Sequence, residues 1–233
     1  MTPLSDNESD MIAEFRRFIN DETYPCVAAR AAMARWNIPC VVAGHMACPH
    51  DDRKILAFLY DFIKQYRKAP AHLHSATVIF QQPRNAGVET FDTLLWQRLQ
   101  ALSTLDASKF PYDRRVKADP SDANFSFSLG EEAFFIIGLH PASERPARRF
   151  RFPALVFNPH AQFELMRKEN RYEKMKQIVR KRDKLYSGSI NPMLADFGEA
   201  SEVFQYSGRQ YDGEWTCPLR IMHDTTDDNS SPK

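Results

Sequence analysis

Two histidines and four arginines lie close together between residues 134 and 163, in the stretch FFIIGLHPASERPARRFRFPALVFNPHAQF. A neutral imidazole can supply a nitrogen ligand to a metal, and a guanidinium can bind a carboxylate or phosphate through two parallel hydrogen bonds. The apolar runs on both sides of these residues would form rigid walls. The combination predicts a site for an anionic cofactor that contains a metal.

The two histidines follow apolar runs that are typical of buried strands. His140 comes at the end of the run 134–139 and precedes Pro141, which restricts the backbone on both sides of their peptide bond. His160 falls in the first turn of a predicted helix, where the helix dipole would favour a neutral imidazole. Each histidine also has a simpler structural interpretation, as a polar residue that is hydrogen-bonded where its element ends or begins.

The arginines of this stretch form the second part of the predicted site. In residues 149–152 the alternation Arg-Phe-Arg-Phe places the aromatic rings on one face and the guanidinium groups on the other. That charged face could hold the carboxylates of a cofactor or substrate, or it could be a solvated edge. The four side chains are Arg145, Arg148, Arg149 and Arg151.

Two further groups of residues carry thiols or carboxylates. Cys26 opens a predicted helix, a position that lowers the pKa of a thiol, although a packing role is the simpler interpretation. A zinc site at Cys40, His45, Cys48 and His50 is a weaker alternative, because the spacing matches no common zinc finger. The apolar, glycine-containing segment 188–198 is typical of a pocket wall or a packed surface loop, and its neighbourhood supplies carboxylates for a cationic substrate. These are Asp196, Glu199 and Glu202.

Composition restricts the function classes. The 233 residues carry a net charge of +1, which argues against nucleic-acid binding driven by overall charge, and the longest apolar runs are too short to span a membrane. The first ten residues, MTPLSDNESD, show no secretory signal, and the four cysteines form no CxxC pair. We therefore expect a cytoplasmic protein with reduced thiols. We also expect a single domain over residues 10–223, with mobile tails at 1–9 and 224–233.

Periodicity predicts an α+β fold with a central mixed or antiparallel sheet flanked by helices. Helices are expected over residues 10–18, after residues 24–26, and over 51–66 and 91–102; strands are expected over 75–80, 125–128, 134–139 and 153–157. Asn158 and Pro159 look like an N-cap and a first helical residue. Since neither Pro nor Gly interrupts residues 160–186, we expect one long basic helix after the last core strand.

With these residues in view, the chain resembles the YqcI/YcgG family, and within it the haem-dependent N-hydroxylases of the guanitoxin-biosynthesis type. The resemblance covers roughly residues 15–218. It rests on YPCVAARAA, FSFSLG, GLHPASERPARRFRFPALVFNPHAQFE and GSINPMLADFGEASEVFQYSGR followed by WTCPL.

The resemblance implies a b-type haem, dioxygen and electrons from a separate ferredoxin or reductase, because the chain has no GxGxxG nucleotide fingerprint. It implies N-hydroxylation of a guanidino or amino nitrogen in a small, arginine-like molecule. His140 would be the axial iron ligand, with His160 and Cys26 as the second and third choices. The haem propionates would meet Arg145, Arg148 and Arg149, and the substrate cation would meet Asp196, Glu199 or Glu131.

Two other function classes remain open at this stage. One is a haem-binding protein without oxygenase activity, which would handle haem or sense a gas. The other is an interaction protein without haem, in which the basic segment 167–184 binds an acidic partner. Absence of a Soret band from supplemented protein would favour the second.

Overall fold

A five-stranded mixed sheet forms the centre of the computed structural model, which describes residues 6–189 and 197–223. The sheet has the order β1-β2-β5-β4-β3, with β1 parallel to β2 and the other neighbours antiparallel. The strands are β1 (Cys40–His45), β2 (Ala76–Gln82), β3 (Phe127–Leu129), β4 (Glu132–Leu139) and β5 (Ala154–Pro159).

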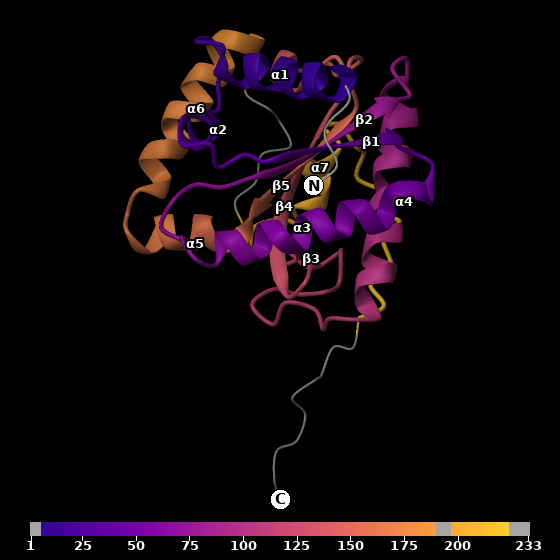
Figure 1. Ribbon diagram of the computed structural model, residues 1–233. Helices are drawn as coiled ribbons and strands as arrows, with labels where there is room; N and C mark the ends of the chain where they lie inside the picture. The colour runs from indigo at the N-terminus through magenta and orange to yellow at the C-terminus, as the bar shows by residue number, and fades with distance from the viewer. Residues whose placement is uncertain (1–5, 190–196, 224–233) are drawn as a thin grey trace, which may run out of the picture.

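Helices cover both faces of this sheet (Figure 1). They are α1 (Asp6–Asn20), α2 (Val27–Ala34), α3 (Asp52–Tyr66), α4 (Val88–Ala107), α5 (His160–Lys168), α6 (Tyr172–Ser187) and α7 (Val203–Tyr206), with short 3-10 turns η1 (Pro49–Asp51) and η2 (Pro146–Arg148). The core strands are continuously apolar because both of their faces are buried. In β2, Val78 and Phe80 pack with α3 and α4, whereas Ile79 packs with α1 and α2.

The α+β fold with a mixed, helix-flanked sheet confirms the fold class expected from periodicity. The single long basic helix is wrong, because α5 ends at Lys168 and α6 begins at Tyr172. Asn170 between them has a φ of 56°, in the left-handed region that asparagine tolerates better than most residues. The chain therefore turns at a residue that is neither glycine nor proline.

The predicted helix start at Asn158 is also wrong. Asn158 still belongs to β5, and its side chain donates to the Phe135 carbonyl and accepts from Ser75 Oγ. Pro159 is the N-cap, and α5 begins at His160. The amide of Asn158 thus joins β5 to the neighbouring strands, and His160 stands at the point where the sheet ends.

Candidate functional site

A cavity of about 270 Å³ lies between one face of the sheet and the helices α1, α2, α5 and α6. The sheet side is apolar: Phe135, Ile137 and Leu139 of β4 line it, because alternate residues of a strand share a face. Phe15 and Ile19 line it from α1. The cavity size is near the lower end of small-molecule sites, which begin at roughly 300 Å³.

Two histidines, His74 and His160, line this cavity, and His74 Nε2 already pairs with the Ala69 carbonyl. His160 enters from the start of α5 and is buried, with 5% of its surface exposed. Its Nδ1 lies 3.4 Å from Glu202 Oε1 and its Nε2 lies 3.4 Å from Glu164 Oε1. Nδ1 has no hydrogen-bond partner among the described residues. The Phe197 ring lies 4.3 Å from the imidazole, centroid to centroid. The site therefore contains a buried imidazole nitrogen that makes no hydrogen bond to the described residues and could bind a metal.

Glu202 supplies a buried carboxylate to the same cavity. Its Oε2 accepts hydrogen bonds from Ser126 Oγ at 2.9 Å and from the Tyr206 hydroxyl at 3.3 Å. Its other oxygen faces His160. Sequence reasoning named Glu202 beside Asp196 and Glu199 but had no signal for its burial, since the surrounding segment has no clear periodicity.

Cys26 lines the cavity on the side of α2. It caps that helix, as its Sγ accepts from the Ala29 backbone N–H at 3.4 Å. The expected depression of its pKa is wrong: burial raises the pKa of the thiol and outweighs the hydrogen bonds from the helix start. Cys26 is thus a cavity residue that favours the neutral thiol.

His140 lies on the opposite face of the sheet from the cavity. It shares a face with Ile136 and Gly138, because alternate residues along a strand point to the same side. Its ring stacks on Phe91 of α4 with centroids 4.2 Å apart. A Cβ added to Gly138 would come within 2.8 Å of Phe91 Cε1, so this glycine allows α4 to lie close beneath the histidine. The structure therefore brings His160, but not His140, to the cavity.

The burial of His140 leads to a prediction about pH. Desolvation, with a smaller contribution from Arg148, lowers the pKa of His140 to about 4. The unfolded chain, whose histidine titrates near 6.5, then binds more protons than the folded protein between these two values. The contribution of this neutral histidine to the free energy of unfolding is fully present above pH 6.5. It falls by roughly 3 kcal/mol as pH drops to about 4. Denaturant unfolding of wild type and His140→Gln from pH 7 to 4 should show a smaller pH dependence in the variant; equal slopes would contradict this.

The three predicted propionate arginines bind other parts of the protein. Arg145 pairs with Asp183 and donates to the Ser189 carbonyl. Arg148 is buried and donates to the Tyr206 carbonyl, and Arg149 donates to carbonyls of the loop that precedes η2. None of these arginines lines the cavity within the described part of the chain. Arg151 is exposed and pairs with Glu14, while the alternating rings of residues 150 and 152 are buried together, as the pattern predicted.

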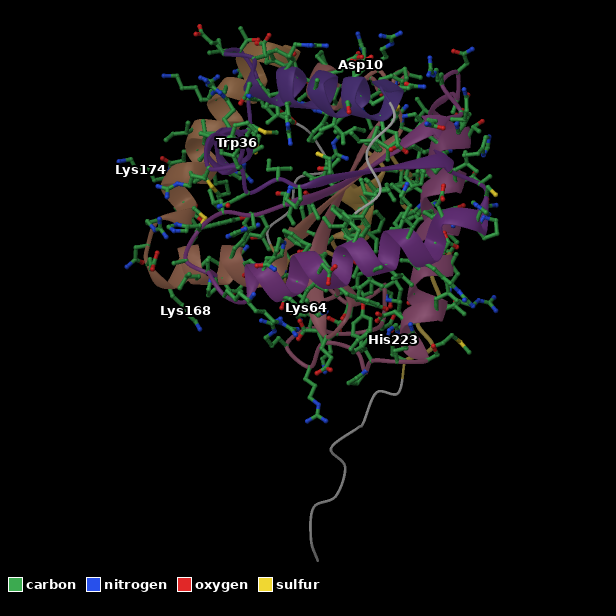
Figure 2. The ribbon with its side chains drawn as sticks, viewed as in Figure 1. Asp10, Trp36, Lys64, Lys168, Lys174 and His223 are labelled. Carbon is green, nitrogen blue, oxygen red and sulfur yellow. The ribbon has the colours of Figure 1, made fainter. Side chains whose placement is uncertain are left out.

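Other basic side chains line the cavity, from α5 and α6: Arg167, Lys176 and Arg180. Arg167 pairs with Glu164 and lies over the Tyr172 ring. Arg180 Nε is buried and has no hydrogen-bond partner among the described residues. Lysines of the same helices, such as Lys168 and Lys174, point away from the protein (Figure 2). The basic segment thus has an inner group of cations and an outer solvated face.

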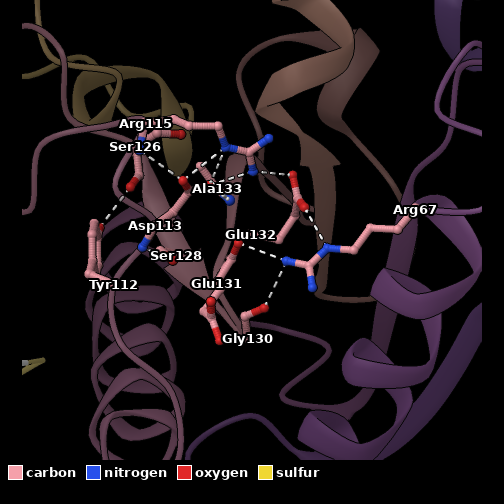
Figure 3. Close-up of polar contacts among 10 residues, drawn as sticks. All are labelled: Arg67, Tyr112, Asp113, Arg115, Ser126, Ser128, Gly130, Glu131, Glu132 and Ala133. Atoms are coloured by element: carbon pink, nitrogen blue, oxygen red, sulfur yellow. Dashed lines mark hydrogen bonds and ion pairs between the residues drawn. The ribbon is translucent and has the colours of Figure 1, made fainter.

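The three acids predicted to receive a substrate cation have different positions. Asp196 lies outside the described residues, and Glu199 is exposed in the turn that follows Phe197. Glu131 is exposed in the β3–β4 turn, where its carbonyl accepts from Arg67 (Figure 3).

The turn that holds Glu131 belongs to an ion-pair network, which Figure 3 shows. Arg115 bridges the buried carboxylates of Asp113 and Glu132, and Arg67 reaches Glu132 from the C-cap position just after α3. The bonds from Arg115 and from the Ala133 backbone outweigh burial and hold the pKa of Asp113 below its ordinary value. These contacts fix the β3–β4 hairpin and give it a structural role.

Among the described residues, no group of three or more His, Cys, Asp or Glu side chains could hold a metal ion, and all four cysteines are free. The zinc alternative at Cys40, His45, Cys48 and His50 thus finds no support. Within the same part of the chain, no helix is both long enough and apolar enough to cross a membrane.

These features describe an α+β domain with a largely apolar cavity on one face of its sheet. The chain belongs to the YqcI/YcgG family, whose model matches residues 15–220. It is 26% identical over 212 residues to the protein YqcI of Bacillus subtilis (strain 168), which is named as uncharacterised; the match covers 87% of this chain and 82% of that protein. No solved structure matched the chain.

Proposed function

We propose that the cavity binds a b-type haem, and that the protein is a cytoplasmic haem-dependent oxygenase that N-hydroxylates a guanidino or amino nitrogen of a small, arginine-like molecule. The observation that carries the proposal is the placement of His160, a buried imidazole with an unbonded nitrogen, in an apolar cavity that also has cationic walls. This proposal agrees with the resemblance to haem-dependent N-hydroxylases within the family.

The cavity residues fit the chemistry of haem in three respects. The ring system needs apolar walls, which α1 and β4 supply. The iron needs a donor atom, and a neutral imidazole is a common one. The two propionates need cations, and Arg167, Lys176 and Arg180 stand on the cavity wall.

Within this proposal His160, in place of His140, is the residue that would bind the iron. His140 is stacked against Phe91 on the other side of the sheet, so it would have to cross the sheet to meet a ligand in the cavity. Cys26 is the second choice, because burial disfavours the thiolate that would bind iron. Glu202 and Glu164 each lie 3.4 Å from one nitrogen of His160. We assign one of these carboxylates the role of fixing the ring orientation, and iron would displace the other from its nitrogen.

Bound haem would supply activation of dioxygen with electrons from a separate ferredoxin or reductase. The residues of the chain have other tasks. The apolar walls exclude water from the reacting nitrogen. Asp196 and Glu199 remain our proposed partners for the substrate cation, because they flank Phe197, which reaches His160. Glu131 is not retained, since it stands in the β3–β4 turn and does not line the cavity.

Haem titration of the full-length protein tests the proposal. We expect a Soret band that saturates at one haem per chain, followed by oxygen consumption that depends on a guanidino compound and on an added electron donor. A folded, haem-supplemented protein without a Soret band would overturn the haem assignment. The basic outer face of α5 and α6 would then become the first candidate, as a surface for an acidic partner.

A haem-binding protein without oxygenase activity is the second candidate. The observation that favours it is that Cys26 and His160 line the same cavity, which therefore carries more than one side chain of a type that binds iron. Binding of both would leave no position for dioxygen. A six-coordinate spectrum in every oxidation state, with no substrate-dependent oxygen consumption, would decide for this alternative.

The propionate assignment leads to a prediction about Arg180. Arg180→Met keeps a long apolar stem but removes the charge, so haem affinity should fall by roughly 10- to 100-fold, the equivalent of about 1.5–3 kcal/mol for a charged hydrogen bond. Arg149→Met is the matched control, because Arg149 bonds to loop carbonyls and does not line the cavity. The measurement is the haem dissociation constant from absorbance titration. Equal losses in the two variants would remove Arg180 from the site.

A further inference from the structure

Aromatic side chains form a continuous series from the protein surface to the cavity. Tyr211 stacks on Trp215 with centroids 3.7 Å apart, and Trp215 lies 5.7 Å from Trp96 of α4. Trp96 stacks on Tyr206 at 6.0 Å, and Tyr206 meets Phe135 edge-on at 5.9 Å. Phe135 lines the cavity, so the series spans from one side of the sheet to the other.

Burial increases along this series from Tyr211 to Tyr206. Tyr211 and Trp215 are half-buried, whereas Trp96 and Tyr206 have 4% and 0% of their surfaces exposed. Tyr206 belongs to α7, which packs on β4 beside the short strand β3. Its hydroxyl accepts from the Phe127 backbone N–H. Tyr206 therefore connects the α4 side of the sheet with the cavity side around the sheet edge.

The redox-active groups at three positions of the series have carboxylate partners. The Tyr211 hydroxyl and the Trp96 indole N–H both donate to Asp92 Oδ1. The Tyr206 hydroxyl lies 3.3 Å from two acceptors, Glu202 Oε2 and the Phe134 carbonyl. Phenols and indoles become strongly acidic when they lose one electron, so a carboxylate that receives the proton makes that oxidation easier. One carboxylate, that of Asp92, thus contacts the redox-active groups of two members of the series.

We propose that the residues Tyr206, Trp96, Trp215 and Tyr211 form a relay that carries a one-electron oxidising equivalent from the cavity to the surface beside α4. This inference rests on the proposed function, because it requires a strong oxidant in the cavity. The relay would protect the site when an oxidant forms there without substrate. The relay is a redox route in addition to the electron supply of the proposed oxygenase. It ends on the α4 side of the sheet, whereas the cavity lies on the other side.

Electrons and protons balance at each step. The oxidant, a porphyrin-centred one-electron oxidant in the cavity, takes one electron from Trp96 across the ring of Tyr206, and the indole proton of Trp96 passes to Asp92. Trp96 recovers its electron from Trp215 and its proton from Asp92. The deficit then passes from Trp215 to Tyr211, which gives one electron and transfers its proton to Asp92. At the surface a one-electron reductant such as ascorbate reduces Tyr211, and Asp92 returns the proton.

A cavity-bound photo-oxidant tests the relay without turnover. The full-length protein is loaded with zinc protoporphyrin and flashed in the presence of hexaammineruthenium(III), which oxidises the excited porphyrin by one electron. We expect transient absorption of tyrosyl and tryptophanyl radicals that grows as the porphyrin radical decays. After repeated flashes, peptide mapping should find oxidation at Tyr211 and Trp215.

Variants separate a relay from ordinary packing. Trp96→Phe keeps an aromatic ring but removes the redox-active indole, so oxidation at Tyr211 should be lost; Tyr211→Phe should lose the tyrosyl signal while the interior stays intact. Tyr60→Phe is the matched control, since Tyr60 is also half-buried and donates to a carboxylate, that of Asp106, but lies outside the series.

The outcomes distinguish the two proposals. Failure of zinc protoporphyrin to bind the folded protein overturns the cavity assignment and the relay together. Binding followed by decay of the porphyrin radical at the same rate in wild type and in Trp96→Phe, with no protein radical, overturns the relay alone. Equal loss of signal in Tyr60→Phe also overturns it, because the residues of the series would then have no special part.

Discussion

His160→Ala should lose stoichiometric haem binding, whereas His140→Ala should keep it. His160 lines the cavity, and its removal leaves His74, whose Nε2 pairs with the Ala69 carbonyl, and Cys26, a half-buried thiol whose pKa is raised. His140 contacts Phe91 on the other side of the sheet. Absorbance titration with haem gives the stoichiometry and the dissociation constant for both variants. Loss of haem from His140→Ala with normal binding by His160→Ala would return the ligand role to His140.

Exogenous imidazole provides the control for the His160 variant. If His160 is lost only as a ligand, free imidazole should enter the vacated space and restore a Soret band, while a folding defect would not respond. The position of the reduced-CO band identifies the ligand class. A thiolate-type band in wild type, lost in Cys26→Ser, would contradict the histidine assignment and make Cys26 the ligand.

The fold was predictable where one pattern continued over a whole element. The apolar period of residues 51–66 and the continuous apolar run of 134–139 became α3 and β4. The break after α5 was not predictable from glycine or proline, because Asn170 adopts a positive φ where the chain turns. β1 was not predicted as a strand, since Cys40–His45 is short and ends in Gly-His.

The site was predicted less well, for reasons that concern tertiary contacts. Strand parity separates His140 from Phe135, Ile137 and Leu139, but both faces of β4 are covered, so apolar character could not show which face borders a cavity. The arginines of η2 were suitable in type, yet Arg145 has a partner 38 residues away in Asp183. Such a partner is visible only once the helices have been placed.

A second large effect is expected on the α3–α4 side of the sheet, from the buried ion pair between Asp52 and Arg98. Their side chains have 4% and 3% of their surfaces exposed. Arg98 also donates from Nε to the Met46 carbonyl at 2.9 Å, so it joins both helices to the loop that follows β1. Burial already lowers the pKa of Arg98, which shows that its charge has lost solvation.

Asp52→Ala should therefore destabilise the fold by about 3–5 kcal/mol, because it leaves a buried guanidinium without its carboxylate. For a chain of this size the melting temperature should fall by roughly 6–20 °C. Asp61→Ala is the matched control on the same helix: it removes an exposed ion pair with Lys64, worth about 0–1 kcal/mol. Denaturant unfolding of both variants measures the difference.

Replacing both members of the buried pair separates lost attraction from uncompensated charge. The double variant Asp52→Leu with Arg98→Met should be more stable than Asp52→Ala, since no charge remains in the apolar interior. Haem titration of the double variant should match wild type, because neither residue lines the cavity. If Asp52→Ala instead unfolds like Asp61→Ala, the guanidinium of Arg98 is not left uncompensated by the loss of Asp52, and the ion pair has no large part in the stability of the fold.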